Sequence, residues 1–263
     1  MFFRGQPGIM RVLQLWLPHL VEDEGAAMSF MISGPSGWGK TRLALLCCNF
    51  LCANQEFGLY VPDQKTGLVT IDSSLKVHFV DEVHKLAMPE YFYPFIDSGR
   101  YIFFFATNEA GDLPEALVNR CKPLIFEPYK SKDLIEIARE HIRHPLRQSF
   151  TDEFLLEIVN AGVENPRIII SICEDLSLYM KRNGLPENVK YVLEEVFGIK
   201  NGVNADGERY LQLLQELGGR ASLNTLAAGM HVNRNMLLYK IEPTLLHLKK
   251  IHISSKGREL LCT

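Results

Sequence analysis

The 263-residue chain contains no long hydrophobic run. Its longest purely apolar stretch, residues 101–106, falls far below the roughly 18 residues that a membrane span needs. The first residues also lack the continuous apolar segment of a secretory signal peptide. The sequence therefore predicts a cytoplasmic protein with no membrane partner.

The six cysteines form no CxxC pair and no metal-ligand spacing, which predicts reduced thiols. A general basic excess is missing too, because the net charge is −3. Residues 218–263 nevertheless carry seven basic and two acidic residues, a net charge of +5 that leaves −8 for residues 1–217. Any nucleic-acid contact is therefore expected in the C-terminal segment.

What is present falls into three blocks, predicted as domains at residues 1–128, 129–199 and 200–263. In the first block apolar strands alternate with helices, which indicates an α/β layer fold with a parallel sheet. The strands are expected at residues 28–33, 77–80 and 101–107, and the helices at 9–20 and 41–53.

The second and third blocks are mostly helical. In the second, Asn165 is a good N-cap ahead of Pro166. Helices are expected there at residues 132–144, 152–161, 166–182 and 186–197. The third block has three helices and two short strands, the pattern of a winged helix-turn-helix. Its helices are expected at residues 206–217, 222–230 and 233–248, and its strands within 251–261.

A glycine-rich loop lies between the first strand and the following helix. Its eight residues fit G-x-x-x-x-G-K-[ST]: Gly34, Pro35, Ser36, Gly37, Trp38, Gly39, Lys40 and Thr41. Glycines let backbone N–H groups face phosphates, and the helix N-terminus adds a favourable dipole. Lys40 is expected to reach the β- and γ-phosphates and the Thr41 hydroxyl to bind Mg²⁺. Trp38 is large for its position, and it either stacks near the nucleotide or packs on the surface.

Two carboxylates, Asp81 and Glu82, end the strand at residues 77–80. After a phosphate-binding loop, this arrangement predicts that Asp81 holds the Mg²⁺ shell and Glu82 polarises the attacking water. Asn108 follows the third strand, where its amide could bond the γ-phosphate or the water. Arg120 and Arg167 are ambiguous by themselves. No Asn-Lys-x-Asp motif is present, which favours ATP over GTP.

Taken in order, these motifs resemble the AAA+ ATPases, and most specifically the RuvB family of Holliday-junction branch-migration motors. The resemblance spans nearly the whole chain. It is carried by Gly5-Gln6, the loop at 34–41, Asp81-Glu82-Val83-His84-Lys85-Leu86, Ala106-Thr107-Asn108-Glu109-Ala110-Gly111, Asn165-Pro166-Arg167, Glu242-Pro243-Thr244-Leu245-Leu246 and Lys256-Gly257-Arg258.

The resemblance implies a role for each matched residue. Asn108 becomes sensor 1, and Arg167, next to Pro166, becomes sensor 2. Arg120 becomes an arginine finger that completes the site of an adjacent subunit, so that activity requires a homo- or hetero-oligomeric ring, a hexamer or pentamer. The segment from Arg4 through Gly5 to Gln6, together with Tyr129, borders the adenine.

Two departures from the RuvB pattern stand out. Only 19 residues, 87–105, separate Leu86 from Ala106, so the hairpin that docks the partner RuvA is expected to be absent or vestigial, which puts a RuvA-like partnership in doubt. The segment before Asp81 is also short, which leaves the usual DNA-facing pore elements in doubt. The sequence around Arg120 is as similar to clamp-loader subunits as to RuvB.

The predicted winged helix supplies candidate contacts to duplex or branched DNA. Residues 233–248 are expected to be the recognition helix, and residues 254–258 the tip of the wing. The candidate DNA-binding residues are Arg234, Lys249, Lys250, Lys256 and Arg258. The alternative is a winged helix that only packs on the lid or binds protein.

Three functions stay open from the sequence. The first is an oligomeric DNA-remodelling motor, driving branch migration or translocation. The second is an ATP-dependent clamp or helicase loader with a replication or recombination partner, and the third is a nucleotide-gated protein scaffold without DNA activity. Stimulation of ATP hydrolysis by DNA separates the first two from the third.

Overall fold

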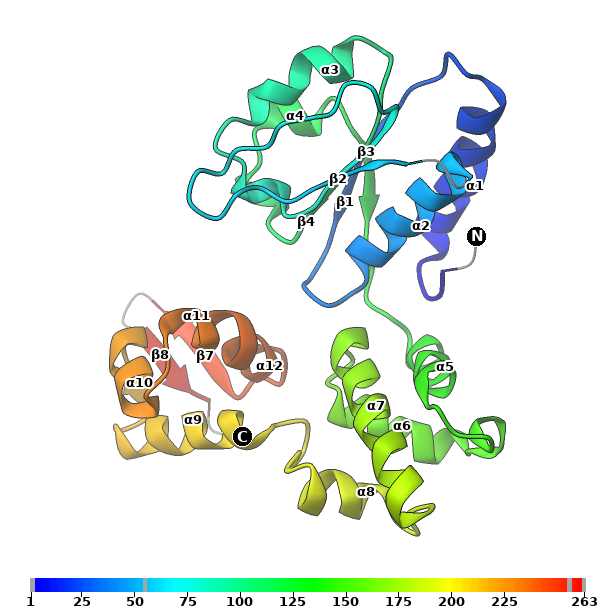
Figure 1. Ribbon diagram of the computed structural model, residues 1–263. Helices are drawn as coiled ribbons and strands as arrows, with labels where there is room; N and C mark the ends of the chain where they lie inside the picture. The colour runs from blue at the N-terminus through cyan, green and yellow to red at the C-terminus, as the bar shows by residue number, and fades with distance from the viewer. Residues whose placement is uncertain (1–2, 54–55, 255–256, 262–263) are drawn as a thin grey trace. The chain divides into compact units, whose positions relative to one another are not determined.

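A computed structural model describes residues 3–53, 56–254 and 257–261. The chain divides into two compact units, Met1–Lys130 and Ser131–Thr263 (Figure 1). The further division of the second unit at residue 200 stays a prediction. Among the described residues, none of the helices combines the length and apolarity of a membrane span.

The first unit is built on a five-stranded sheet of entirely parallel pairs, in the order β2-β3-β4-β1-β5. The strands are β1 (Ser29–Ser33), β2 (Gly58–Tyr60), β3 (Val77–Val80), β4 (Ile102–Thr107) and β5 (Lys122–Ile125). The predicted strands are confirmed as β1, β3 and β4. The other two escaped prediction, because β2 has three residues and β5 carries Pro123, which only an edge strand tolerates.

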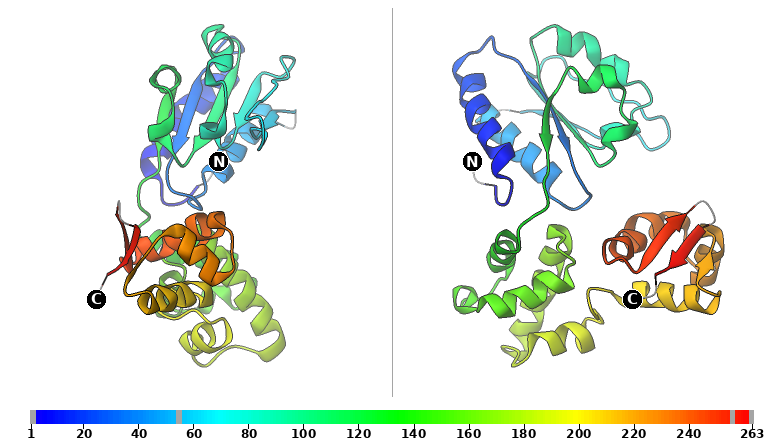
Figure 2. Two further views of the ribbon diagram at one scale, coloured as in Figure 1. Left: turned by 90° about the vertical axis from the view of Figure 1, so that its left-hand side faces the viewer. Right: turned by 180° about the vertical axis from the view of Figure 1, so that it is seen from behind.

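Helices cover both faces of this sheet (Figures 1 and 2). One face carries α1 (Pro7–Glu22) and α2 (Lys40–Cys52), and the other carries α3 (Tyr93–Asp97) and α4 (Glu115–Val118). Side chains of β4 alternate between the two faces. Phe104 stacks on Phe30, with ring centroids 5.1 Å apart. Phe103 and Phe105 pack with Phe92 on the other face.

The connection between β3 and β4, residues 81–101, is fully described and contains no strand. It forms three short helices: η1 (Val83–Lys85), η2 (Pro89–Phe92) and α3. The expected absence of a hairpin at this point is therefore confirmed for the structure. A short helix, η3 (Ala110–Asp112), follows β4.

The second unit begins with a helical part whose helices α5, α6 and α7 pack together. Its elements are α5 (Ser131–His141), η4 (Arg147–Ser149), α6 (Asp152–Ala161), α7 (Pro166–Asn183), α8 (Val189–Tyr191) and η5 (Val192–Val196). Asn165 caps α7 by accepting a hydrogen bond from the Arg167 amide at 3.0 Å, as the sequence predicts. The predicted helix at 186–197 starts later than expected, and η5 is a π-turn.

The rest of the second unit has the helix order and antiparallel sheet of a winged helix. Its elements are α9 (Ala205–Glu216), β6 (Arg220–Ala221), α10 (Leu223–Met230), α11 (Arg234–Met236), η6 (Leu237–Ile241), α12 (Glu242–His247), β7 (Ile251–Ser254) and β8 (Gly257–Leu260). The sheet order is β6-β8-β7. The sequence did not predict the two-residue β6.

A π-turn interrupts the predicted recognition helix. η6 separates α11 from α12, and Pro243 stands at the start of α12. A proline lacks an N–H and its ring clashes with the carbonyl four residues earlier, so a regular α-helix resists it. The wider turn just ahead of Pro243 accommodates that clash. The helix predicted at 233–248 is therefore present, but with a different hydrogen-bond pattern at its centre.

Candidate nucleotide-binding site

The glycine-rich loop joins the end of β1 to the start of α2, as the motif requires. A side chain at Gly34 is excluded, because its Cβ would lie 2.6 Å from the Cβ of Phe126. Gly39 adopts a left-handed φ of 98° immediately before α2. The loop therefore approaches neighbouring chain too closely for larger residues, and it leads into the positive end of a 13-residue helix.

Lys40 lies within this loop and is only 8% exposed. Its ammonium donates to the carbonyls of Gly34 at 2.7 Å and Pro35 at 2.9 Å. These bonds keep the charge at the mouth of the loop, where a phosphate oxygen can replace the carbonyl acceptors. A lysine held in this way is a point charge ready for an anion.

Thr41 and Asp81, the two predicted magnesium ligands, touch directly. The Thr41 hydroxyl donates to Asp81 Oδ2 at 2.8 Å, although the residues lie 40 positions apart. Asp81 Oδ1 accepts the Glu82 amide at 2.9 Å. The described residues contain no cluster of three or more His, Cys, Asp or Glu suited to a metal. Mg²⁺ commonly uses one or two protein oxygens plus substrate phosphates, so this hydroxyl–carboxylate pair fits it.

Glu82 follows Asp81 in a left-handed conformation, with φ of 54°. Its carboxylate lies 2.6 Å from the Lys85 ammonium and 3.6 Å from His84 Nε2. Partial burial by itself would raise the pKa of Glu82. The hydrogen bond to Lys85 and the charges of Lys85, His84 and Lys40 together outweigh burial and lower that pKa. Glu82 therefore stays ionised at neutral pH.

Asn108, directly after β4, leaves one polar atom without a partner. Its amide Oδ1 is buried and forms no hydrogen bond with any described residue. A buried unsatisfied polar atom costs about 1–3 kcal/mol, and native proteins contain few of them. Because an amide oxygen only accepts hydrogen bonds, the orphaned atom fits a donor such as a water molecule, and the amide N–H groups are the end that could donate to a phosphate.

Arg120 is held inside its own chain by contacts that the sequence did not predict. Its guanidinium makes two parallel bonds to Asp97, at 2.9 and 3.1 Å, and donates to the Ala116 carbonyl at 2.9 Å. It also stacks 4.6 Å from the ring centroid of Tyr93. The hydrogen bond to Asp97 raises the pKa of Arg120. The pair is solvent-exposed, so breaking it to release the arginine costs little free energy.

The chain segments expected to border the adenine meet beside the loop. Gln6 is 2% exposed and exchanges two hydrogen bonds of 2.9 Å with the backbone of Glu127. The Tyr129 hydroxyl donates to the Trp38 carbonyl at 2.8 Å, and the two rings pack edge to face. Trp38 thus packs against Tyr129. Arg4 and Gly5 lie in the same N-terminal segment and are half-buried.

The other predicted residues belong to the second unit. Pro166 is buried at the start of α7, and Arg167 beside it is exposed. Arg234 and Lys249 are exposed, whereas Lys250 is half-buried. Lys256 lies outside the described residues.

Arg258 turns inwards in this structure, so its predicted contact with DNA stays a prediction that the geometry does not favour. Its side chain is 14% exposed and makes bonds of 2.9 and 3.1 Å to the carboxylate of Glu242, which is 1% exposed. The Tyr210 hydroxyl donates to the same carboxylate at 2.9 Å. Glu242 would be left uncompensated if Arg258 turned outwards, so the pair is internal to the winged helix.

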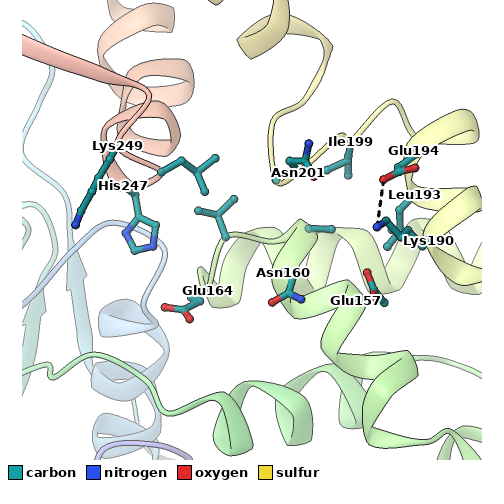
Figure 3. A pocket seen from close by; sticks show the side chains of 14 residues that line it. Glu157, Asn160, Glu164, Lys190, Leu193, Glu194, Ile199, Asn201, His247 and Lys249 are labelled. Carbon is teal, nitrogen blue, oxygen red and sulfur yellow. Dashed lines mark ion pairs between the residues drawn. The ribbon is translucent and has the colours of Figure 1, made fainter. Parts of the chain in front are cut away.

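Lys249 also lines a pocket of about 600 Å³ in the second unit (Figure 3). Figure 3 shows Lys249 and His247 at one end, with Glu164 below them. Glu157 and Glu194 also line the pocket, and Glu194 pairs with Lys190 at 4.0 Å. The three glutamates share the pocket with two lysines and a histidine, so no excess of positive charge marks the pocket as a phosphate site.

Comparison with known proteins agrees with this arrangement. The family described as "RuvB C-terminal winged helix domain" matches residues 200–261. The "Holliday junction branch migration complex subunit RuvB" of Campylobacter lari is 26% identical over 97% of this chain and 85% of its own length. The RuvB of Helicobacter hepaticus is also 26% identical, over 97% of this chain and 87% of its own.

A solved structure shows the same fold. The Thermotoga maritima RuvB Holliday junction branch migration motor superposes with a TM-score of 0.76 at 24% identity, covering 98% of this chain and 92% of that one. This chain is a RuvB-like AAA+ protein. The expected α/β AAA+ core with a C-terminal winged helix is therefore confirmed.

Within this RuvB-like chain, sequence reasoning missed four residues that shape the sites. Asp97 and Tyr93 hold Arg120, and no motif marks them. Glu242 enters the sequence analysis only through the family resemblance, although a glutamate inside an apolar helical pattern is itself a signal of a buried charge. His84 follows Asp81-Glu82 in the matched motif, which gives it no role of its own.

Proposed function

We propose that this chain is the ATP-hydrolysing subunit of an oligomeric motor that remodels branched DNA. The observation that carries the proposal is the extent of the similarity. Proteins named as branch-migration subunits match 97% of the chain, including both the nucleotide loop and the winged helix. The clamp-loader and scaffold alternatives have no comparable support and become outcomes of the test.

In this proposal the loop binds the phosphates of ATP. Lys40 exchanges its carbonyl acceptors for β- and γ-phosphate oxygens. Thr41 and Asp81 would hold Mg²⁺, which would neutralise phosphate charge. Glu82 orients and polarises the attacking water. The unpartnered Asn108 Oδ1 accepts a hydrogen bond from that water, and the amide N–H groups can donate to the γ-phosphate. Arg167 acts as a second sensor from α7. Gly5, Tyr129 and their neighbours enclose the adenine.

Arg120 acts on the nucleotide of an adjacent subunit, so activity requires a ring. The exposed pair with Asp97 holds the arginine until a phosphate of higher charge competes for it. Such a finger can contribute about 10³- to 10⁵-fold in rate. The same exposed geometry that makes Asp97 a weak partner keeps Arg120 accessible to another subunit.

Contact with DNA is assigned to the winged helix. The candidates are Arg234, Lys249, Lys250 and Lys256, because Arg258 is bonded to Glu242 inside the winged helix. Because residues 81–101 contain no strand, docking of a junction-binding partner such as RuvA on a hairpin here is not part of the proposal. A partner in recombination or replication would need another surface.

The test is steady-state ATP hydrolysis across protein concentration with no DNA, duplex, single-stranded and four-way-junction DNA. We expect the junction to stimulate most, with activity rising steeply with concentration as rings form. Lys40→Ala should be inactive, and Lys132→Ala, which changes an exposed lysine of α5, serves as its matched control. Slow hydrolysis that ignores every DNA would favour a loader or scaffold instead.

A further inference from the structure

His84 occupies a buried position between the ends of β3 and β4. Its side chain is 6% exposed. Its Nδ1 lies 3.1 Å from the Thr107 hydroxyl at the end of β4. Its Nε2 faces two carboxylates, Glu82 at 3.6 Å and Glu109 at 3.9 Å. One imidazole ring thus lies between Thr107, at the end of β4, and Glu82, the carboxylate assigned to water activation.

The contacts on the two sides of the ring favour one tautomer of the neutral imidazole. The Thr107 oxygen accepts the Glu109 backbone N–H at 2.9 Å, and its hydroxyl can donate to His84 Nδ1. The ring proton then sits on Nε2 and points towards Glu82 and Glu109. The opposite tautomer would aim a lone pair at two carboxylates, which electrostatics disfavour.

Lys85 also contacts Glu82, but it holds the carboxylate less firmly than a buried group can. Its side chain is 54% exposed, so water screens the contact and the long side chain moves easily. His84 is enclosed, and Thr107, its partner, is 1% exposed. Lys85 makes the shorter contact with the Glu82 carboxylate, at 2.6 Å, and the buried ring, 3.6 Å away, bounds the space open to that carboxylate on the protein side.

We propose that His84 is a positioning residue that couples the tip of β4 to Glu82. The inference rests on the function proposed above and deepens it. Asn108, with its unpartnered amide end, follows Thr107 directly in the chain. A nucleotide that engages Asn108 displaces the β4 tip, Thr107 passes that displacement to His84, and His84 sets the direction of the Glu82 carboxylate. Water activation is thereby tied to a correctly bound phosphate.

The chemistry requires such positioning, because a displacement of about 1 Å at the reacting groups can lower a rate by about 10²-fold. His84 itself touches neither the nucleotide nor the water in this scheme. Its removal should therefore leave ATP affinity intact and slow only the hydrolytic step. A purely structural residue would lower affinity, folding and turnover together.

The experiment measures ATP affinity and single-turnover hydrolysis for His84→Ala, His84→Gln, Thr107→Val and Thr107→Ser in the full chain. We expect His84→Ala and Thr107→Val each to hydrolyse about 30-fold more slowly, with ATP affinity within about threefold of the unchanged chain. His84→Gln keeps an N–H donor towards Glu82 and Thr107→Ser keeps the hydroxyl, so both should recover most of the rate. His19→Ala, an exposed histidine on α1, is the control.

The double variant His84→Ala/Thr107→Val tests the coupling itself. If the two residues act in one chain of contacts, the double variant should be no slower than the worse single variant. If the rate losses of the two single variants multiplied in the double variant, the link through Thr107 would be overturned. Normal hydrolysis by His84→Ala would overturn the role of His84. Either result leaves the proposed ATPase function standing. Failure of the unchanged chain to bind or hydrolyse ATP would instead remove that function, and this inference with it.

Discussion

The nucleotide end of the first unit and the basic end of the second unit teach different lessons about charged residues. At the nucleotide end, a loop and two strand tips bring Lys40, Thr41 and Asp81 together around a common centre. In the winged helix, the predicted basic surface is partly consumed by internal pairs, with Arg258 on Glu242 and Arg220 on Glu259 at 3.0 Å. A motif with fixed spacing specifies geometry, whereas a charge count does not say which way a side chain points.

The largest effects should arise at the nucleotide end. Lys40→Ala removes the charged donor from the loop and should weaken ATP binding by about 100-fold or more. Glu82→Gln should still bind ATP but hydrolyse it about 10²- to 10⁴-fold more slowly, because the base is gone while the loop is intact. Equilibrium nucleotide binding and turnover separate the two. Near-normal ATP affinity in Lys40→Ala would show that the motif does not specify the binding geometry, so the nucleotide end would be no better predicted than the winged helix.

Arg120 is paired within its own chain, and the next experiment asks whether it still acts on the nucleotide of an adjacent subunit. Arg120→Ala should lose about 10³-fold in turnover and regain part of it when mixed with Lys40→Ala, since each supplies what the other lacks. Turnover is measured across mixing ratios. If no mixture of the two variants is more active than its components, Arg120 does not act between subunits, and its pair with Asp97 is structural.

The winged helix should show a stability effect where the sequence suggested a binding effect. Glu242→Gln leaves the buried Arg258 guanidinium without its counter-charge and should lower the free energy of unfolding by about 3 kcal/mol. Glu259→Gln, at the exposed pair with Arg220, is the matched control and should cost less than about 1 kcal/mol. Urea titration measures both. Equal costs would show that the Glu242 pair is no more important than a surface pair.

The same region offers a binding counterpart to that stability experiment. Lys249→Ala should leave stability unchanged but reduce the slope of log affinity against log salt for duplex DNA by about 0.9 if the lysine contacts a phosphate. Arg258→Ala should instead lower stability. If Arg258→Ala reduced the slope and left the unfolding transition unchanged, Arg258 would be a DNA contact and not a structural partner of Glu242.

The smallest effect concerns His78, buried in β3 among Tyr60, Tyr101 and Phe103. Burial lowers its pKa below 6.5, and its bond to Leu75 and the charge of Asp72 only partly oppose this. The unfolded chain therefore takes up the proton first, and this contribution to stability is lost as pH falls below 6.5. The free energy of unfolding should therefore fall more between about pH 7.5 and about pH 5.5 for the unchanged chain than for His78→Phe.

Elements with a strong period or a cap were predictable from the chain alone. The all-buried strands β3 and β4, the Asn165 cap and the loop at 34–41 all rest on local rules of spacing and hydrogen bonding. Short or interrupted elements were not. β2, β5 and β6 form because neighbouring strands offer backbone partners. The π-turn before Pro243 accommodates a steric clash that arises only within a formed helix.

The sequence alone determined the α/β core, the identity of the loop residues and the order in which candidate catalytic groups leave the strands. These depend on contacts between near neighbours in the chain, where periodicity and motif spacing have direct geometric meaning. Only the tertiary structure decided that Thr41 reaches Asp81 across 40 residues, that Asp97 holds Arg120, that Thr107 meets His84, and that Arg258 turns inwards to Glu242. Each of these pairings depends on how distant segments pack, and burial then determines which partner a charged or polar side chain must keep.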